Sequence, residues 1–326
     1  MIQDTRFLDA ASVEAFARDG VVCIRGALSG TELSNLERAI DDAVAHVGKT
    51  ASGYDITAIA NAVWLEGQDV IDGRGARQYN LDALASLVRV SGAELLRDRK
   101  PEDAPGDLGH FLVDTGVWTR SAEMRSVALS PTLAQIAGEL LQAQDIRFYD
   151  DQVFVKEPGT IDRTAYHQDL GYFHIEGDQG CVMWAPVDRT SRETGALGYV
   201  RGSHRWGKMF KPNIFMSRLA IPGSEGEEQP DIDNNEDRYD IVYFDVEPGD
   251  VIVHHFRTVH GSHGNASTTQ TRRAASLRYV GERVRYRARP GAPAQPHRPI
   301  DWADGTALCD PLFPLVWRYA RPAVAA

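Results

Sequence analysis

The chain has 326 residues, of which 43% are hydrophobic and 25% are charged, as is usual for a soluble globular protein that can bury a full core. Its formal net charge of −11 argues against a nucleic-acid-binding protein, because such proteins neutralise phosphates with Lys and Arg. The N-terminus has no basic segment leading into an apolar run, and no stretch approaches the roughly 18 consecutive apolar residues of a membrane span.

We therefore expect neither a signal peptide nor a membrane association. The three cysteines, Cys23, Cys181 and Cys309, are too few and too scattered for a disulfide framework or a thiolate metal site. They fit a reducing compartment, and we expect a cytoplasmic protein.

Helical patterns dominate the first part of the chain. Val13, Phe16 and Ala17 have the spacing of one helical face, and Gly20 marks the end of that helix before a strand over 21–24. Ser29 and Glu32 form a capping-box pattern, followed by an apolar stripe at Leu33, Leu36, Ile40, Val44 and Val47. Residues 50–109 contain no motif, and we expect helices joined by exposed loops. Ser130-Pro131 predicts the start of another helix.

The apolar period changes from 3.6 to 2 in residues 146–156, where helices give way to sheet. Further strand-like runs, separated by turn sequences, lie at 180–187, 197–200, 241–244, 251–256 and 274–284. Many short strands without intervening helices predict a mainly β fold with flanking helices, built as a sandwich or barrel-like jelly roll. We expect one domain over 1–326, with a helix-rich N-terminal layer (1–145), a β core (146–290) and a C-terminal extension (291–326).

An acidic stretch rich in Pro, Asp and Glu covers residues 224–240. We expect a long surface loop there. A solvated insertion and an active-site lid are equally compatible with this composition.

Half of a metal site is visible in residues 164–173. His167 and Asp169 are two residues apart, so in a strand both side chains would project from the same face and could bind one ion. A facial triad of two His and one carboxylate needs another His from elsewhere in the chain. His260 is the best candidate among ten histidines, because Gly261 and Ser262 let the chain turn closely around an ion. His254 and His255 would point to opposite faces of their strand, so one of them could line the pocket.

Arg272 follows on the next predicted strand, where its guanidinium could receive a carboxylate in two parallel hydrogen bonds, as a bound dicarboxylate would need. The whole pattern includes Phe16–Val22, Val155–Gly159, His167–Phe173, Glu193–Leu197, Val200–His204 and Arg272–Ser276. Together these segments, over roughly residues 8–285, resemble the phytanoyl-CoA dioxygenase (PhyH-like) family of iron(II)- and 2-oxoglutarate-dependent oxygenases.

The resemblance implies a double-stranded β-helix that binds iron through His167, Asp169 and His260. It also implies that Arg272 pairs with the distal carboxylate of 2-oxoglutarate, that Ser262 and Trp184 lie beside it, and that Gln152 and Lys156 make further contacts to this co-substrate. Arg273 is the alternative anchor, since the match can slip by one residue. Only one of the two can point inward, because neighbours on a strand face opposite ways.

If Arg272 faces the pocket, Ala274, Ser276 and Arg278 do so too, and Arg278 becomes a candidate for binding an acidic group of the substrate. The residues that flank the iron ligands are expected to shape the pocket: Tyr166, Gln168, Tyr172 and Phe173.

Family chemistry implies that dioxygen and 2-oxoglutarate are converted to succinate and carbon dioxide while a C–H bond of the substrate is hydroxylated, with ascorbate as a candidate activator. Relatives that halogenate have a small residue in place of the aspartate, so Asp169 favours hydroxylation. Desaturation or cyclisation by the same oxidant stays open, because substrate placement decides among these outcomes.

We expect a small-molecule substrate, either a carboxylate-bearing metabolite or a natural-product intermediate. An acyl-CoA 2-hydroxylase is a second possibility, in which the arginines of 283–289 would bind CoA phosphates, although a solvated strand face explains them as well. The sequence is also compatible with a metal enzyme that does not use 2-oxoglutarate and with a non-catalytic metal-binding or structural β-domain. It does not indicate an oligomeric state.

Overall fold

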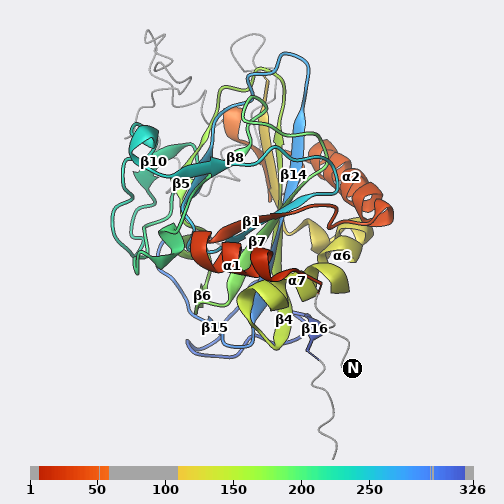
Figure 1. Ribbon diagram of the computed structural model, residues 1–326, viewed down its shortest axis with the longest axis vertical. Helices are drawn as coiled ribbons and strands as arrows, with labels where there is room; N and C mark the ends of the chain where they lie inside the picture. Colours follow the sequence, from red (N-terminus) through yellow and green to blue (C-terminus); the bar gives the residue numbers. More distant parts are fainter. Residues whose placement is uncertain (1–6, 51, 59–108, 294, 296, 320–326) are drawn as a thin grey trace, which may run out of the picture.

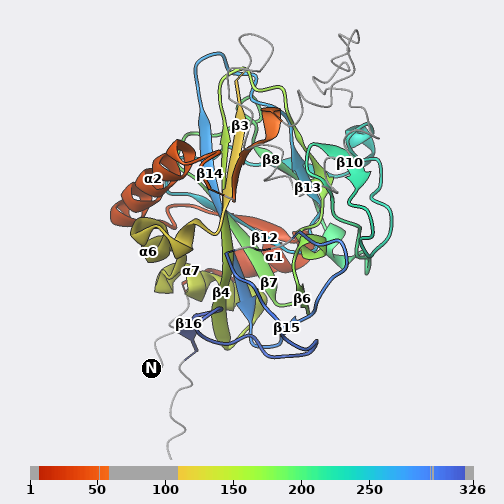
Figure 2. The same ribbon diagram turned by 180° about the vertical axis from the view of Figure 1, so that it is seen from behind.

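Two antiparallel β-sheets face each other at the centre of the protein, which we describe in a computed structural model covering residues 7–50, 52–58, 109–293, 295 and 297–319 (Figures 1 and 2). The helices expected between 59 and 108 lie outside the described residues. Within the described part, the larger sheet has eight strands, in the order β1-β12-β7-β14-β4-β3-β2 with β16 also paired to β4. These strands are β1 (Val21–Ile24), β2 (Gly53–Asp55), β3 (Phe111–Thr115), β4 (Asp145–Lys156), β7 (Gly180–Pro186), β12 (Val251–His255), β14 (Arg272–Gly281) and β16 (Leu315–Arg318).

The smaller sheet has the order β11-β8-β13-β5. Its strands are β5 (Thr164–His167), β8 (Leu197–Val200), β11 (Ile241–Tyr243) and β13 (His260–Ser262). Two short two-stranded sheets accompany them: β9 (Asn213–Ile214) with β10 (Ser217–Ala220), and β6 (Ile175–Glu176) with β15 (Arg285–Tyr286). This arrangement confirms the predicted mainly β fold with a jelly-roll core.

The helices cover the outer face of the larger sheet, on the side away from the smaller sheet (Figure 1). They are α1 (Ala10–Asp19), α2 (Gly30–Ala45), α6 (Ala122–Ala128) and α7 (Pro131–Leu141). Their apolar faces form one core with the outward side chains of the central strands, among them Met183, Val253 and Leu277. Burial of this apolar surface holds the larger sheet in place behind the pocket.

Local signals fix the helix ends as predicted. Gly20 ends α1 with a φ of 77°, a left-handed conformation that glycine adopts without strain. Ser29 and Glu32 form a reciprocal capping box at α2, and the Ser130 hydroxyl accepts from the Leu133 N–H at the start of α7. Val47 is not part of the apolar stripe of α2, because the helix ends at Ala45.

The long strand β14 determines which side chains enter the space between the sheets. It begins at Arg272 and ends at Gly281, rather than running from 274 to 284. Ala275, Leu277 and Tyr279 pack into the helix-covered core. Arg272, Ser276 and Arg278 point to the opposite side and line the pocket between the sheets.

No helix within the described residues is long and apolar enough to cross a bilayer.

Candidate metal centre and its pocket

Two histidines from the smaller sheet and one aspartate that follows it in the chain converge between the two sheets. His167 is the last residue of β5, His260 is the first residue of β13, and the two are direct partners in the strand pairing. One ligand atom from each of His167, Asp169 and His260 lies within 4.8 Å of the others, and all three residues are buried. This spacing allows the three atoms to bind one metal ion.

His167 and Asp169 do not lie on a single strand. Strand β5 ends at His167, and Asp169 is the first residue of the short 3-10 helix η3 (Asp169–Tyr172). Gln168 between them keeps an extended backbone, with φ −105° and ψ 140°. The alternation of side chains therefore continues for one residue beyond the strand, and both ligands still project to the same side.

Hydrogen bonds orient each candidate ligand. The Nδ1 atoms of His167 and His260 lie 2.8 Å from the Ala165 carbonyl oxygen and 3.0 Å from the Thr258 carbonyl oxygen. A carbonyl oxygen only accepts, so each Nδ1 carries the proton and Nε2 is free to bind a metal. His254, on β12, is 3.0 Å from Asp169 through its Nε2 and donates to Oδ2 of that carboxylate. Its own Nδ1 is buried and has no hydrogen-bond partner among the described residues.

The electrostatic setting favours the protonation states that a metal needs. Burial lowers the pKa of both His167 and His260 to about 4, so the imidazoles are neutral near pH 7. Burial alone would raise the pKa of Asp169, but the charge of His260 and the hydrogen bond from His254 outweigh it and hold that pKa well below its usual value. Two neutral imidazoles and one carboxylate are the donor set of a 2-His-1-carboxylate site for iron(II).

A pocket lies beside these ligands, between the two sheets. At one end lies Arg272, whose side chain is only 2% exposed and whose Nε has no hydrogen-bond partner among the described residues. The guanidinium carbon is 5.6 Å from the centre of the Trp184 ring, and Ser262 lies at the same end. A buried guanidinium without a protein acceptor costs free energy unless a ligand supplies an anion. The arrangement is suited to a carboxylate.

The choice between Arg272 and Arg273 follows from the same strand geometry. Arg272 points into the pocket, whereas Arg273 is on the outer face and forms ion pairs of 2.8 Å with Asp188 and 2.7 Å with Asp41. Burial lowers the pKa of Arg272 to about 10, which still leaves the side chain charged at neutral pH.

Lys156 and Gln152 share one face of β4 but have different neighbours. Lys156 is fully buried and donates from Nζ to the Ser262 hydroxyl at 2.8 Å and to the His263 carbonyl oxygen at 2.6 Å. Burial, and then the nearby charge of Arg272, lower its pKa well below the usual value for lysine. Lys156 does not line the pocket itself and reaches it through Ser262. Gln152 lines the pocket but accepts a hydrogen bond from Arg278, at 2.6 Å.

Of the five residues proposed for the substrate, Arg278 lines the pocket and the remaining four do not. The rings of Tyr172 and His167 are nearly perpendicular with their centroids 5.4 Å apart, and Phe173 packs beneath Arg278. The Gln168 amide is bonded to the backbone of Phe210 and Arg257, and the Tyr166 hydroxyl contacts Glu236 and Tyr243.

Four pocket residues were not found from the sequence: Phe154, Thr164, Leu197 and Phe215. Phe154 lies between Gln152 and Lys156 on the same face of β4, so period-two counting could have found it. Phe215 has a φ of 36°, stacks on Phe154 at 5.8 Å and lies 5.6 Å from His167. No local sequence pattern predicts that conformation for phenylalanine.

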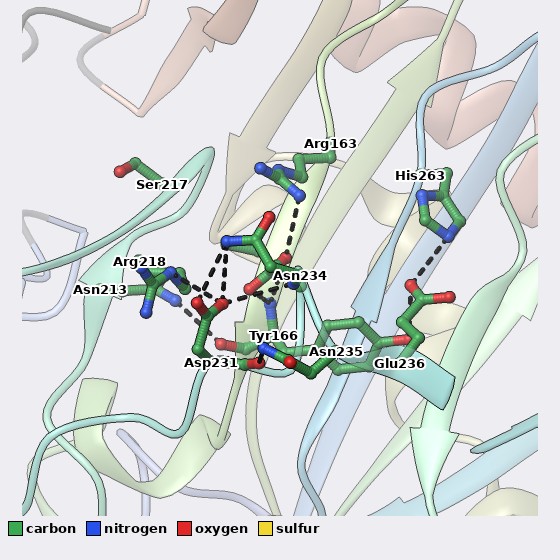
Figure 3. A network of polar contacts seen from close by, with 12 residues as sticks. Arg163, Tyr166, Asn213, Ser217, Arg218, Asp231, Asn234, Asn235, Glu236 and His263 are labelled. Carbon is green, nitrogen blue, oxygen red and sulfur yellow. Dashed lines mark hydrogen bonds and ion pairs between the residues drawn. The ribbon is translucent and has the colours of Figure 1, made fainter. Parts of the chain in front are cut away.

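The acidic segment 224–240 packs against the smaller sheet, as Figure 3 shows for part of it. Ile232 and Asp233 are buried, and both oxygens of Asp233 lie within 3.4 Å of the Tyr166 N–H. Glu236 forms an ion pair of 2.9 Å with His263, which follows β13 (Figure 3). The segment is therefore anchored beside both strands that carry the candidate histidine ligands, and a fully solvated insertion is excluded.

Of the arginines of 283–289, Arg283 is exposed, whereas the other three are engaged by the protein. Arg289 is buried and donates to the carbonyl oxygens of Phe173 and Ile175. Arg287 pairs with Glu225 at 2.9 Å, and Arg285 donates to nearby backbone oxygens. These side chains bind parts of the fold to one another.

Comparison with known proteins places this site in a family. The family model described as phytanoyl-CoA dioxygenase (PhyH) matches residues 16–274, which include all three candidate ligands and Arg272. The chain belongs to the phytanoyl-CoA dioxygenase family. This assignment confirms the resemblance inferred from the motifs.

Two curated relatives match parts of the chain. A probable alpha-ketoglutarate-dependent hypophosphite dioxygenase of Stutzerimonas stutzeri is 29% identical over 152 residues, which are 46% of this chain and 49% of that protein. A probable phytanoyl-CoA dioxygenase of Caenorhabditis elegans is 28% identical over 121 residues, which are 37% of each protein. The match thus spans about half or less of the length of these relatives.

Solved structures share the fold over nearly the whole chain. The non-heme alpha ketoglutarate dependent carbocyclase SnoK from nogalamycin biosynthesis superposes with a TM-score of 0.61 at 22% identity, covering 95% of this chain and 97% of that chain. The epimerase SnoN from the same biosynthesis gives 0.60 at 20% identity, covering 94% and 98%. At such identities the likeness supports the family's jelly-roll fold rather than a particular reaction.

Proposed function

We propose that this protein is an iron(II)- and 2-oxoglutarate-dependent dioxygenase that hydroxylates an unactivated C–H bond of a small organic substrate and releases succinate and carbon dioxide. The observation that carries this proposal is the pairing of two features in one pocket. A 2-His-1-carboxylate set lies beside the buried guanidinium of Arg272, whose Nε has no hydrogen-bond partner among the described residues and which is suited to a dicarboxylate. A metal enzyme that does not use 2-oxoglutarate has no need of the second feature.

The pocket residues have different roles, which follow from where they lie. His167, Asp169 and His260 would hold iron(II), with the backbone acceptors of Ala165 and Thr258 keeping Nε2 of each imidazole available. When bound, iron(II) supplies oxygen activation coupled to decarboxylation of the 2-oxo acid.

Arg272 would orient the distal carboxylate of 2-oxoglutarate, and Ser262, held by Lys156, would donate to the same group. The apolar walls of Phe154, Leu197 and Phe215 exclude water from the reacting centre.

Binding and turnover of the purified protein test this proposal. Under anaerobic conditions, iron(II) and then 2-oxoglutarate are titrated and followed by the metal-to-ligand absorption of their complex. Succinate formation in air is then measured with ascorbate, first without substrate and then with panels of small acids, amines and acyl-CoA thioesters. We expect both titrations to saturate for the wild type, and we expect His167→Ala to lose the iron-dependent signal.

Rival functions give different results in the same assays. Iron binding without any effect of 2-oxoglutarate would favour another metal enzyme on this fold. Absence of both binding events would favour a non-catalytic β-domain. Product analysis by mass spectrometry separates hydroxylation from desaturation or cyclisation, because only hydroxylation adds one oxygen atom to the substrate.

A further inference from the structure

A second buried guanidinium lies in the pocket, on the same strand as Arg272. Arg278 is 5% exposed and lines the pocket together with Ser276, which lies between the two arginines on β14. The strand pairing places Arg278 opposite Val182 of β7, and Val182 is also the partner of His254 on β12. Arg278 and His254 therefore flank one residue of β7, and His254 in turn binds Asp169. This places Arg278 at the metal end of the pocket.

Among the residues that the structure describes, Arg278 uses few of its hydrogen-bond donors. Its Nη2 donates to Oε1 of Gln152 at 2.6 Å, while its Nε is buried without a partner among the described residues. The guanidinium carbon lies 5.0 Å from the centre of the Phe173 ring, so the ring fixes the plane of the group. A guanidinium held by one amide and one aromatic ring keeps several N–H donors for an acceptor from outside the protein.

No carboxylate in the described part of the chain forms an ion pair with Arg278. Asp150, its register partner on β4, is engaged by His297 at 3.1 Å and Arg298 at 3.5 Å. The neighbouring Asp151 accepts from the backbone N–H groups of Val117 and Trp118. Both acids are stabilised by the charge of Arg278, but within the described residues their hydrogen bonds and close ion pairs are with other groups.

The sum of formal charges in the loaded pocket also favours an anion beside Arg278. The charges of iron(II), Asp169, Arg272 and 2-oxoglutarate cancel when all four are together. Arg278 then remains as a buried positive charge near the metal ligands, where a negative charge on the substrate would be stabilised most strongly.

We propose that Arg278, oriented by Gln152, is a second anion-binding subsite that receives an oxyanion group of the organic substrate, such as a carboxylate or phosphonate. This inference rests on the proposed function. Gln152, which was expected to contact 2-oxoglutarate, would instead orient a group that binds the substrate. It also makes the enzyme selective for acidic substrates, because a neutral analogue would leave the guanidinium buried and unpaired.

The experiment uses the protein loaded with iron(II) and 2-oxoglutarate in the absence of oxygen. Straight-chain carboxylates from acetate to hexanoate, and methylphosphonate, are titrated by calorimetry, with the matching amides as neutral probes. We expect at least one anion to bind the wild type and Arg278→Met to weaken it at least about 10-fold, since a charge-assisted bidentate contact is lost. Arg273→Met, on the outer face of the same strand, is the matched control and should bind that anion as the wild type does.

A second variant separates charge from geometry. Arg278→Lys keeps the charge but not the planar fork, so we expect intermediate affinity for the anions, and this result decides the matter if Arg278→Met does not fold. Equal anion binding by wild type and variant overturns the proposal, and so does the absence of anion binding to the wild type up to about 100 mM.

A loss of 2-oxoglutarate affinity in Arg278→Met as large as that in Arg272→Ala would also overturn it, because the guanidinium would then belong to the co-substrate. Failure of the proposed function is visible separately, since the wild type would then not bind iron(II) or 2-oxoglutarate in the loading step.

Discussion

Arg272 and Arg273 are neighbours on β14, yet they occupy opposite environments. Arg273 lies on the outer face between two carboxylates, and its charge is balanced by the protein. Arg272 is buried between the sheets, and within the described part of the chain its Nε has no hydrogen-bonded acceptor, so its charge is open to a partner from outside. The face of a strand, rather than the residue type, thus separates a structural ion pair from a binding group.

Ligand affinity should show the largest difference between the two arginines. Arg272→Ala should weaken 2-oxoglutarate binding by about 100-fold or more, because the buried carboxylate loses its charged donor. Arg273→Ala should change it by less than about twofold, as expected of a surface substitution away from the site. Anaerobic titration of 2-oxoglutarate into the iron-loaded variants measures both. Equal effects would remove the distinction between the faces.

His254 also faces the pocket but, unlike Arg272, has a side-chain hydrogen bond within the protein, to Asp169. Because its Nε2 fixes one oxygen of Asp169, His254→Phe should weaken iron(II) binding by about 10- to 100-fold, as is usual when a residue that orients a ligand is lost. His254→Gln can still donate an N–H and should lose less. Competition with a chelator gives the dissociation constants. Unchanged affinity in His254→Phe would mean that the strand geometry alone positions Asp169.

Lys156 is expected to act on the co-substrate indirectly, through Ser262. Its hydrogen bond to Ser262 predicts that Lys156→Met weakens 2-oxoglutarate binding by about 10-fold and that Ser262→Ala does much the same. The double variant should then be little worse than either single variant, because both remove one shared contact. Additive losses in the same titration would show that Lys156 reaches the co-substrate independently.

In the ligand-free protein, substitutions of the two arginines should have opposite effects on the free energy of unfolding. Arg272→Met removes a buried, unbalanced charge and should raise the free energy of unfolding by about 1 kcal/mol or more. Arg273→Met breaks partly exposed ion pairs and should lower it by less than about 1 kcal/mol. Urea unfolding of the metal-free protein measures both. A loss of stability in Arg272→Met would indicate an unrecognised acceptor for the guanidinium.

The metal-free protein should also lose stability as the pH falls below neutrality. The pKa of His167 and His260 is depressed to about 4 in the fold, against roughly 6.5 in the unfolded chain. As the pH falls from neutrality, the unfolded state therefore takes up protons before the folded state does, and unfolding becomes more favourable. Between pH 7 and pH 6 these two imidazoles should contribute about 1 kcal/mol to the decline. The doubly substituted His167→Asn, His260→Asn protein should therefore show a flatter pH profile than the wild type.

Most of the fold was predictable because its signals are local. The caps at Gly20, Ser29 and Ser130 and the period-two runs of the central strands each specify their own conformation. The convergence of His167, Asp169 and His260 was predictable from residue chemistry combined with the family resemblance. Alternation along the strand also predicted that Arg272 and Arg273 face opposite ways, although it did not decide which of them points inward.

The remainder depends on contacts between distant segments. The sequence near Phe215 gives no reason for its left-handed backbone, which follows from packing against Phe154 and His167. The burial of Arg289 depends on backbone oxygens at Phe173 and Ile175, more than a hundred residues away in the chain. Composition alone suggested a solvated face there, and only the tertiary structure supplies the acceptors.

The direct pairing of His167 with His260 has a consequence for the tolerance of the chain to insertions and deletions. Both imidazoles depend on the register between β5 and β13, so a single residue inserted into either strand would turn one of them to the far side of the sheet. Insertions between Gly223 and Gly226 would leave that register intact. Length variation in this lineage should therefore be absent from the two short strands and concentrated in the loops outside them.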